Sequence, residues 1–238
     1  MGNRNSVVAM KASHECSVCG WPLIKEYPPF ELVVDGASKT LEGVPGWRCR
    51  SCGEIYHDTN DVLNAKAIVR AYDLGLYTND LPAALLLYTP IEGKEAVPIP
   101  GKTVFQKELW YLSKGTENTS FPRPNFMPMQ GGPWDPNLDM RLERMQSKGL
   151  LDVIKTNVSK EKTAHKYRLT ATGKEKISRI WQTLPDSVRN KLVEVKSRLN
   201  NLTAEEIVNL VHQEFPKMWD KSKLERWGIN IEEIQEPP

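Results

Sequence analysis

The chain has 238 residues, of which 39% are hydrophobic and 26% are charged, and its formal net charge at pH 7 is +2. This is the composition of a soluble globular protein with one or two domains. The longest uncharged apolar stretch, residues 81–88, is far shorter than the roughly 18 residues that span a bilayer. The first fifteen residues lack the apolar core of a secretory signal. We therefore expect a cytoplasmic protein with no membrane segment.

Charge is unevenly distributed along the chain. Residues 141–198 carry 15 Lys or Arg and 6 Asp or Glu, a net charge of +9. The segments before and after it have net charges of −3 and −4. A basic middle segment indicates binding to nucleic acid or to an acidic protein face, or else a set of solvated helix faces.

The four cysteines form two Cys-x-x-Cys pairs, Cys16 and Cys19 in "HECSVCGWP" and Cys49 and Cys52 in "WRCRSCGEI". Two such pairs can supply four thiolates to one tetrahedral ion, for which zinc is the usual choice. In a reducing compartment they bind metal more often than they form disulfides. Four thiolates leave no position for a reactive water, so we expect a structural ion. Iron in a rubredoxin-like centre uses the same ligands and is the alternative.

The residues beside the cysteines fit such a centre. Gly20 and Gly53 follow the two pairs, where a tight turn directs backbone N–H groups toward sulfur and often needs a positive φ. His14 and His57 lie nearby in the sequence, but the thiolates already fill the coordination shell. We therefore expect both histidines to be neighbours and not ligands.

Short elements surround the two pairs. Residues 31–34 and 39–44 are predicted strands separated by the turn pair Asp35-Gly36, an arrangement typical of a zinc ribbon. Residues 57–75 are a predicted helix that Asp58 or Thr59 can cap. Residues 1–75 are therefore predicted to form a small zinc-ribbon-like domain with a trailing helix, in which the metal supplies much of the folding energy.

Residues 16–75 resemble the zinc-binding N-terminal domain of the MqsA/YgiT-type antitoxins. The shared features are the separation of the two cysteine pairs, the approach "LEGVPGWRCRSCGE" and the helix that follows. The resemblance implies a structural metal and contact with a cognate toxin ribonuclease. That family's usual helix-turn-helix does not follow in this sequence, so the resemblance does not imply DNA binding.

The rest of the chain is mainly helical. Helices are predicted at residues 81–88, within 101–115 and at 135–149, where Gly149 ends the third of them. Predicted strands at 150–154 and 166–170 flank a polar turn, and a helix follows at 171–184. This is the element order of a winged helix, with the hairpin as the wing. Two more helices are predicted at 185–200 and 203–216. The expected fold class is α+β, with a winged-helix-like domain over residues 76–238.

Residues 115–136 contain five prolines and three glycines and are predicted to be irregular. Aromatic and methionine side chains of the kind enriched in interface cores occur there. We predict a partner-binding loop formed by Phe121, Phe126, Met127, Met129 and Trp134. The alternative is that the loop packs back on its own domain.

A second resemblance covers residues 78–224. The segments "GGPWDPNLDMRLERMQSKGLL", "YRLTATGKEKI" and "LTAEEIVNLVHQEFPKM" are similar to the SocA-like, or Panacea, antitoxin-associated domain. The resemblance implies neutralisation of a toxin by direct binding, or binding of another protein as an adaptor. The insertion "TENTSFPRPNFMPMQ" departs from that pattern.

The sequence contains no HExxH, Walker A, GxSxG or dinucleotide-binding motif, and we expect a protein that is not an enzyme. A catalytic site assembled from distant residues is the remaining enzyme hypothesis. The first functional hypothesis is a protein-binding antitoxin or antitoxin-like adaptor. The second is a winged-helix DNA-binding regulator. In the second, Arg141 and Arg144 of the third helix would face the major groove, and the phosphate contacts would be made by Lys155, Lys160, Lys162, Lys166, Arg168 and Lys174.

Overall fold

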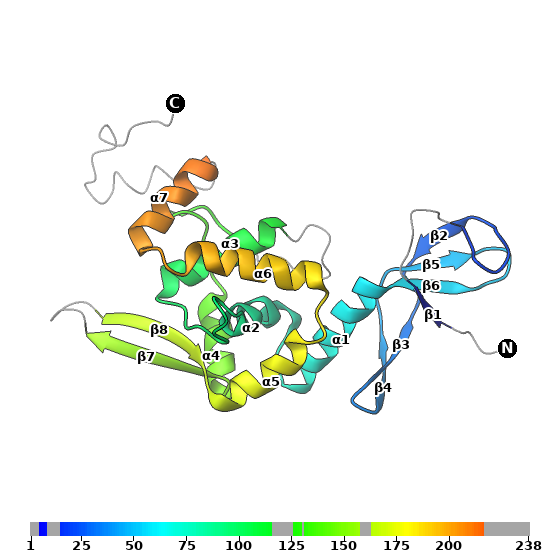
Figure 1. Cartoon of the computed structure of the whole chain (residues 1–238), viewed down its shortest axis with the longest axis horizontal. Coiled ribbons are helices and arrows are strands. Elements are labelled where there is room, and N and C mark those ends of the chain that lie inside the picture. The colour runs from blue at the N-terminus through cyan, green and yellow to red at the C-terminus, as the bar shows by residue number, and fades with distance from the viewer. Residues whose placement is uncertain (1–4, 9–14, 116–125, 130, 158–162, 217–238) are drawn as a thin grey trace.

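The computed structural model describes residues 5–8, 15–115, 126–129, 131–157 and 163–216. Within these residues the protein is α+β, with seven α-helices and three small sheets, which confirms the expected class. A β-rich part lies at one end of the molecule and a helical part at the other (Figure 1). The helix α1 (Thr59–Asp73) runs between them.

The β-rich part contains a four-stranded sheet with the strand order β1-β6-β5-β2. Its strands are β1 (Asn5–Val8), β2 (Leu23–Glu26), β5 (Gly46–Cys49) and β6 (Ile55–Asp58). β5 pairs antiparallel with both β2 and β6, and β1 runs parallel to β6. None of these four strands is predicted from the sequence. Three of them, NSVV, LIKE and IYHD, do not alternate between apolar and polar residues, and the fourth, GWRC, runs into the second cysteine pair.

A separate hairpin consists of β3 (Phe30–Val34) and β4 (Ala37–Leu41). Its turn residues Asp35 and Gly36 have φ angles of 49° and 85°. Positive φ at both central residues is what a two-residue hairpin turn of type I′ requires, so the predicted Asp-Gly turn is confirmed. β4 ends at Leu41, three residues earlier than predicted, because the chain then leads into β5.

The helix α1 takes part in two hydrophobic cores. Its N-cap is Asp58, whose side chain accepts a hydrogen bond from the Asn60 N–H at 2.8 Å. Val62 and Val69 pack against the buried side of β3, whereas Ala67 and Ala71 belong to the large core of the helical part. At 100° per residue these pairs lie on opposite sides of the helix. The predicted domain boundary at 75/76 therefore follows a helix that both cores share, and the division into two domains stays a prediction.

The helical part begins with the short 3-10 helix η1 (Thr78–Asp80) and α2 (Leu81–Tyr88), all eight residues of which are buried. The other elements of this part are α3 (Lys102–Gly115), α4 (Leu138–Ser147), β7 (Leu151–Asn157), β8 (Thr163–Leu169), α5 (Ala171–Trp181), α6 (Asp186–Leu199) and α7 (Ala204–Glu214). The predicted order of three helices, a hairpin and a helix is thus observed. The hairpin strands are longer than predicted, and the residues between them at 158–162 lie outside the described part.

A close backbone contact holds α5 beside the start of the hairpin. The Thr170 N–H donates to the carbonyl of Leu150 at 3.0 Å, and the Thr170 side chain caps α5 by accepting from the Gly173 N–H at 2.9 Å. A Cβ atom at Gly173 would lie 2.1 Å from the Leu150 carbonyl oxygen. Only glycine fits at this approach, which explains a residue that otherwise weakens a helix.

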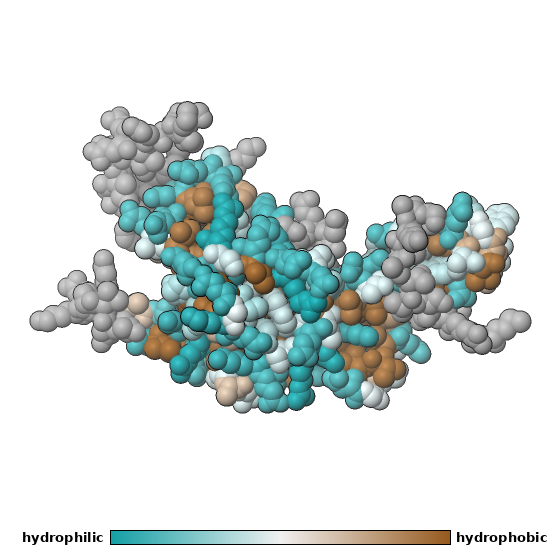
Figure 2. Space-filling model, in the orientation of Figure 1, coloured by the Kyte–Doolittle hydropathy of each residue, from teal (hydrophilic) through white to brown (hydrophobic). Residues whose placement is uncertain are grey.

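Arg70 of α1 ties the two parts together. Its guanidinium donates to the Asp35 carboxylate at 2.9 Å in the hairpin turn and to the Arg179 carbonyl at 2.7 Å in α5. Figure 2 shows hydrophobic residues gathered over the hairpin and the adjoining end of α1, while most of the visible helical part is hydrophilic. Val33, 65% exposed on β3, is one of the outward-facing apolar residues of the hairpin.

Candidate metal centre and macromolecule-binding surfaces

The two Cys-x-x-Cys pairs form turns with the same backbone hydrogen bonds. In the first, the Gly20 N–H donates to the Cys16 carbonyl and the Cys16 N–H to that of Trp21, both at 2.8 Å. In the second, the Gly53 N–H donates to the Cys49 carbonyl and the Cys49 N–H to that of Glu54, both at 2.9 Å. Gly20 and Gly53 have φ angles of 73° and 79°, as the turn geometry predicts.

The sheet brings the two turns together. β2 follows the first cysteine pair and β5 ends in the second, and Leu23 of β2 lies opposite Cys49 of β5. The four Sγ atoms all lie within 4.8 Å of one another. The contact between Cys16 and Cys52 is 3.5 Å and that between Cys19 and Cys49 is 3.4 Å. The four cysteines therefore form one cluster that could hold a metal ion.

The donor set fits a tetrahedral thiolate centre. With metal–sulfur bonds of about 2.3 Å, the sulfurs of a regular tetrahedron lie about 3.8 Å apart. The observed contacts are close to that value and far longer than a disulfide bond of about 2.0 Å. All four cysteines are free; Cys16 and Cys49 are buried, and Cys19 and Cys52 are exposed. The centre therefore has a protein-facing side and a solvent-facing side.

The surroundings favour ionised sulfur at the inner side of the cluster. Burial raises the pKa of the Cys16 thiol. Hydrogen bonds from the Tyr56 hydroxyl and from the backbone of Cys19 and Val18 outweigh this and lower the pKa to about 6. For Cys52, the Glu54 backbone lowers the pKa, but burial and the other three thiols raise it to about 12. A bound cation removes this conflict, because it deprotonates the thiols that coordinate it.

His57 is a structural neighbour of this centre. It is fully buried, its Nδ1 lies 2.9 Å from the Pro45 carbonyl oxygen, and its ring contacts that of Phe30 with a centroid distance of 4.3 Å. The potential ligand cluster contains the four cysteines and not His57, as predicted. His14 lies outside the described residues.

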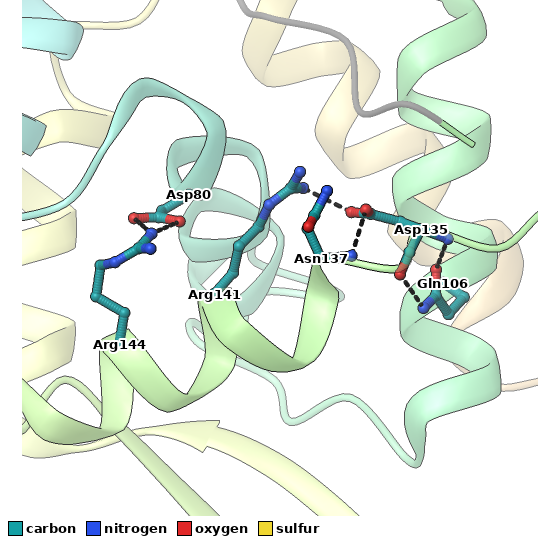
Figure 3. Close-up of polar contacts among 6 residues, drawn as sticks. All are labelled: Asp80, Gln106, Asp135, Asn137, Arg141 and Arg144. Carbon is teal, nitrogen blue, oxygen red and sulfur yellow. Dashed lines mark hydrogen bonds and ion pairs between the residues drawn. The ribbon is translucent and has the colours of Figure 1, made fainter. Parts of the chain in front are cut away.

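The two arginines expected in the major groove point into the protein (Figure 3). Arg141 is 3% exposed, and its guanidinium lies 2.7 Å from the carboxylate of Asp135. Arg144 contacts both oxygens of the fully buried Asp80 carboxylate at 2.6 and 2.7 Å and stacks over the Tyr77 ring at 4.2 Å. The structure thus commits both side chains to internal ion pairs, and Arg141 has no surface to offer to DNA.

The outward face of α4 is not basic. Asp139, Met140 and Glu143 are exposed there, and Asp139 pairs with Lys102 of α3. Such a face repels a phosphate backbone. The periodicity of the sequence predicted α4 but did not show which side of the helix faces solvent. The expectation that Arg141 and Arg144 face outward was therefore wrong.

The basic residues of the β7–β8 hairpin are exposed but do not share one face. Lys166 lies opposite Ile154 in the ladder and Lys155 lies opposite His165, and neighbouring pairs project to opposite faces of a two-stranded sheet. Arg168 is 3.4 Å from Asp152. Lys174 is exposed in the first turn of α5. Lys160 and Lys162 lie outside the described residues.

The described part of the predicted partner-binding loop packs partly on its own domain. Phe126 contacts the Trp110 ring edge-on with a centroid distance of 5.1 Å. Met127 and Trp134 exchange two backbone hydrogen bonds at 2.8 and 2.9 Å. Met127 remains 44% exposed, whereas Trp134 and Met129 are half-buried. Phe121 lies outside the described residues.

Sequence reasoning missed the buried polar groups that shape this region. Gln106 of α3 clamps the backbone of Asp135: its Nε2 donates to the Asp135 carbonyl at 3.0 Å, and its Oε1 accepts from the Asp135 N–H at 2.8 Å. Glu108 is fully buried near Lys196, and burial raises the pKa of Glu108 to about 8. The sequence did contain one signal for these groups: the charged residue Glu108 lies among the apolar residues of the predicted helix at 101–115.

Among the described residues, the longest apolar helix falls short of what a bilayer crossing requires. Comparison of the chain with known protein families, with curated proteins and with solved structures finds no match.

Proposed function

We propose that this protein is a non-enzymatic antitoxin or antitoxin-like adaptor that binds and neutralises a partner protein, with a structural zinc ion in its N-terminal domain. The observation that carries the proposal is the orientation of α4. Its arginines, which would read DNA, are paired inside the protein, while Met140 is 51% exposed and shares the outward side of α4 with the exposed Asp139 and Glu143. Exposed methionine and aromatic side chains are typical of protein interfaces.

Zinc is the proposed ion because four thiolates in a closed tetrahedral set are its usual structural ligands. The ion would be held by Cys16, Cys19, Cys49 and Cys52, and it would join the two cysteine turns into one lobe. The paired turns and the β2–β5–β6 strands support a zinc-ribbon-like arrangement. Rubredoxin-like iron is the competing ion, and metal analysis of the purified protein distinguishes the two.

The element order α2, α3, α4, hairpin β7–β8 and α5 supports a winged-helix-like body. In this body we propose a partner-binding surface formed by Met127, Trp134 and Met140, called here the Met–Trp surface. Lys102 links Trp134 to the first turn of α4, because its Nζ lies 4.7 Å over the Trp134 ring and also pairs with Asp139, the residue before Met140. The surface thus joins an apolar centre to charged neighbours, as interface cores and rims do.

Co-expression with the product of the adjacent gene tests the protein-binding function. If that product is a toxin, the wild-type chain should restore growth and co-purify with it. Replacing Met127 and Met140 with Glu should weaken binding by tenfold or more, because it places charge in the centre of the interface. Val33→Glu is the control: Val33 is 65% exposed, compared with 44% for Met127 and 51% for Met140, and it lies on the β3–β4 hairpin. Failure of the wild-type chain to bind or neutralise its neighbour would overturn the proposal.

DNA binding is the second candidate, favoured by the exposed lysines of the hairpin and of α5. If it is correct, a fragment of the protein's own promoter should bind with an affinity that falls steeply as salt rises, because bound counterions are released. Lys166→Glu and Lys174→Glu should each weaken binding and reduce the salt dependence, by about one counterion per lost phosphate contact. Lys94→Glu, at an exposed position outside this region, is the control. Absence of a salt-sensitive complex would remove this candidate.

A further inference from the structure

Beside the cysteine cluster lies a buried tyrosine that the proposed function does not use. Tyr56 is 3% exposed and belongs to β6, where it lies opposite Trp47 of β5. Its hydroxyl is 3.3 Å from the Sγ of Cys16 and 3.0 Å from the Oγ of Ser17. Because the ring is fixed in a sheet and packed with Leu23 and Cys49, its hydroxyl is held in place at the inner side of the cluster.

The chemistry of a metal-bound sulfur fixes the direction of these hydrogen bonds. A coordinated cysteine is a thiolate, which can accept a hydrogen bond but has no proton to donate. The Tyr56 hydroxyl must therefore donate to Cys16, and its oxygen can accept from the Ser17 hydroxyl. Ser17, Tyr56 and Cys16 then form a directed chain that ends on the metal ligand.

We propose that Tyr56 is a positioning residue of the metal centre, which holds the Cys16 thiolate in place and slows release of the ion. This proposal rests on the metal assignment made above. Among the described residues, Cys16 is the one ligand with a hydroxyl contact. The buried Cys16 and Cys49 form the inner side of the centre and are expected to release the ion last. A chelator would first compete with the exposed Cys19 and Cys52.

Chelator competition on the full-length protein tests this role. Tyr56→Phe keeps the ring and removes the hydroxyl, and loss of such an outer-shell partner typically weakens metal binding 10- to 100-fold. We expect zinc affinity to fall by about tenfold and the rate of transfer to a chromophoric chelator to rise by a similar factor. Ser17→Ala, at an exposed position, should give a smaller change in the same direction, because it removes the second link of the chain.

A suitable control is Tyr72→Phe. The Tyr72 hydroxyl also contacts a hydroxyl oxygen, that of Thr78 at 3.2 Å, but the ring is exposed in the last turn of α1, at the opposite end of that helix from β6. Its removal should leave metal affinity and release unchanged. A general effect of removing a tyrosine hydroxyl is thereby separated from an effect on the metal ligand.

Cobalt substitution supplies a readout that a purely structural role would not move. The sulfur-to-cobalt charge-transfer band reports the electron density on the thiolates, so losing a donor to Cys16 should shift it to longer wavelength. The shift is expected in Tyr56→Phe and, to a smaller extent, in Ser17→Ala. Unchanged affinity, release rate and spectrum in a folded Tyr56→Phe protein would overturn the proposal. Should Tyr56→Phe not fold, an unchanged Ser17→Ala would do so. A wild-type chain that binds no metal would instead overturn the metal assignment itself.

Discussion

Replacing Cys49 with Ser is expected to unfold the β-rich part of the protein while the helical part stays folded. Cys49 is fully buried and ends β5, the strand that pairs with both β2 and β6. The small core around it consists of Cys16, Leu23, Cys49 and Tyr56, so two of its four members are metal ligands. Metal binding to such a module contributes on the order of 10 kcal/mol of folding free energy, which this core cannot replace.

Hydrogen exchange and limited proteolysis measure this effect. In Cys49→Ser, and in wild-type protein treated with a strong chelator, amides of β2, β5 and β6 should lose protection, and bound zinc should fall below one equivalent. Amides of α2 and α3 should keep theirs, because they lie in the separate large core. Ser51→Ala, an exposed position in the same turn, is the control and should retain both metal and protection. Full protection of these amides in metal-free protein would contradict the prediction, because it would show that the β-rich part folds without an ion.

The elements that sequence reasoning identified depend on local chemistry. The Cys-x-x-Cys-Gly turns, the Asp35-Gly36 hairpin turn and the Asp58 cap of α1 are each fixed within a few residues. Their geometry follows from the φ angles that glycine permits and from side chains that reach nearby backbone groups. The cysteine cluster could be predicted because one ion can join two local turns, whatever lies between them.

The contacts that were missed join residues through the tertiary fold. Asp80 precedes its partner Arg144 by 64 residues, and the two meet only because η1 packs beside α4. Nothing in the helical pattern of residues 135–149 distinguishes an arginine that faces solvent from one that faces a buried aspartate. Tyr56 was missed for a similar reason, since its role appears only when β6 lies beside the first cysteine pair.

The inward arginines also explain how the Met–Trp surface is built. Asp135 accepts from the Asn137 N–H at 2.9 Å at the start of α4 and pairs with Arg141 one turn into the helix. Gln106 fixes the backbone of Asp135 to α3 (Figure 3). The network therefore sets the position of α4 relative to Trp134, and with it the exposed residue Met140. Arg141, expected from the sequence to contact DNA, instead orients α4 through its ion pair with Asp135.

Replacing Asp135 with Ala is accordingly expected to destabilise the helical part strongly. Arg141 would remain buried without its counterion, and breaking such a pair from one side costs about 3–5 kcal/mol. Urea unfolding followed by circular dichroism should show the loss as a lower midpoint.

Asp139→Ala is the control for this prediction. It breaks the ion pair between Asp139 and Lys102, in which Asp139 is largely exposed, and should cost less than about 1 kcal/mol. The double variant Asp135→Leu with Arg141→Met should recover much of the stability, because an apolar pair of similar size needs no counterion. If Asp135→Ala is as stable as Asp139→Ala, the buried pair does not position α4.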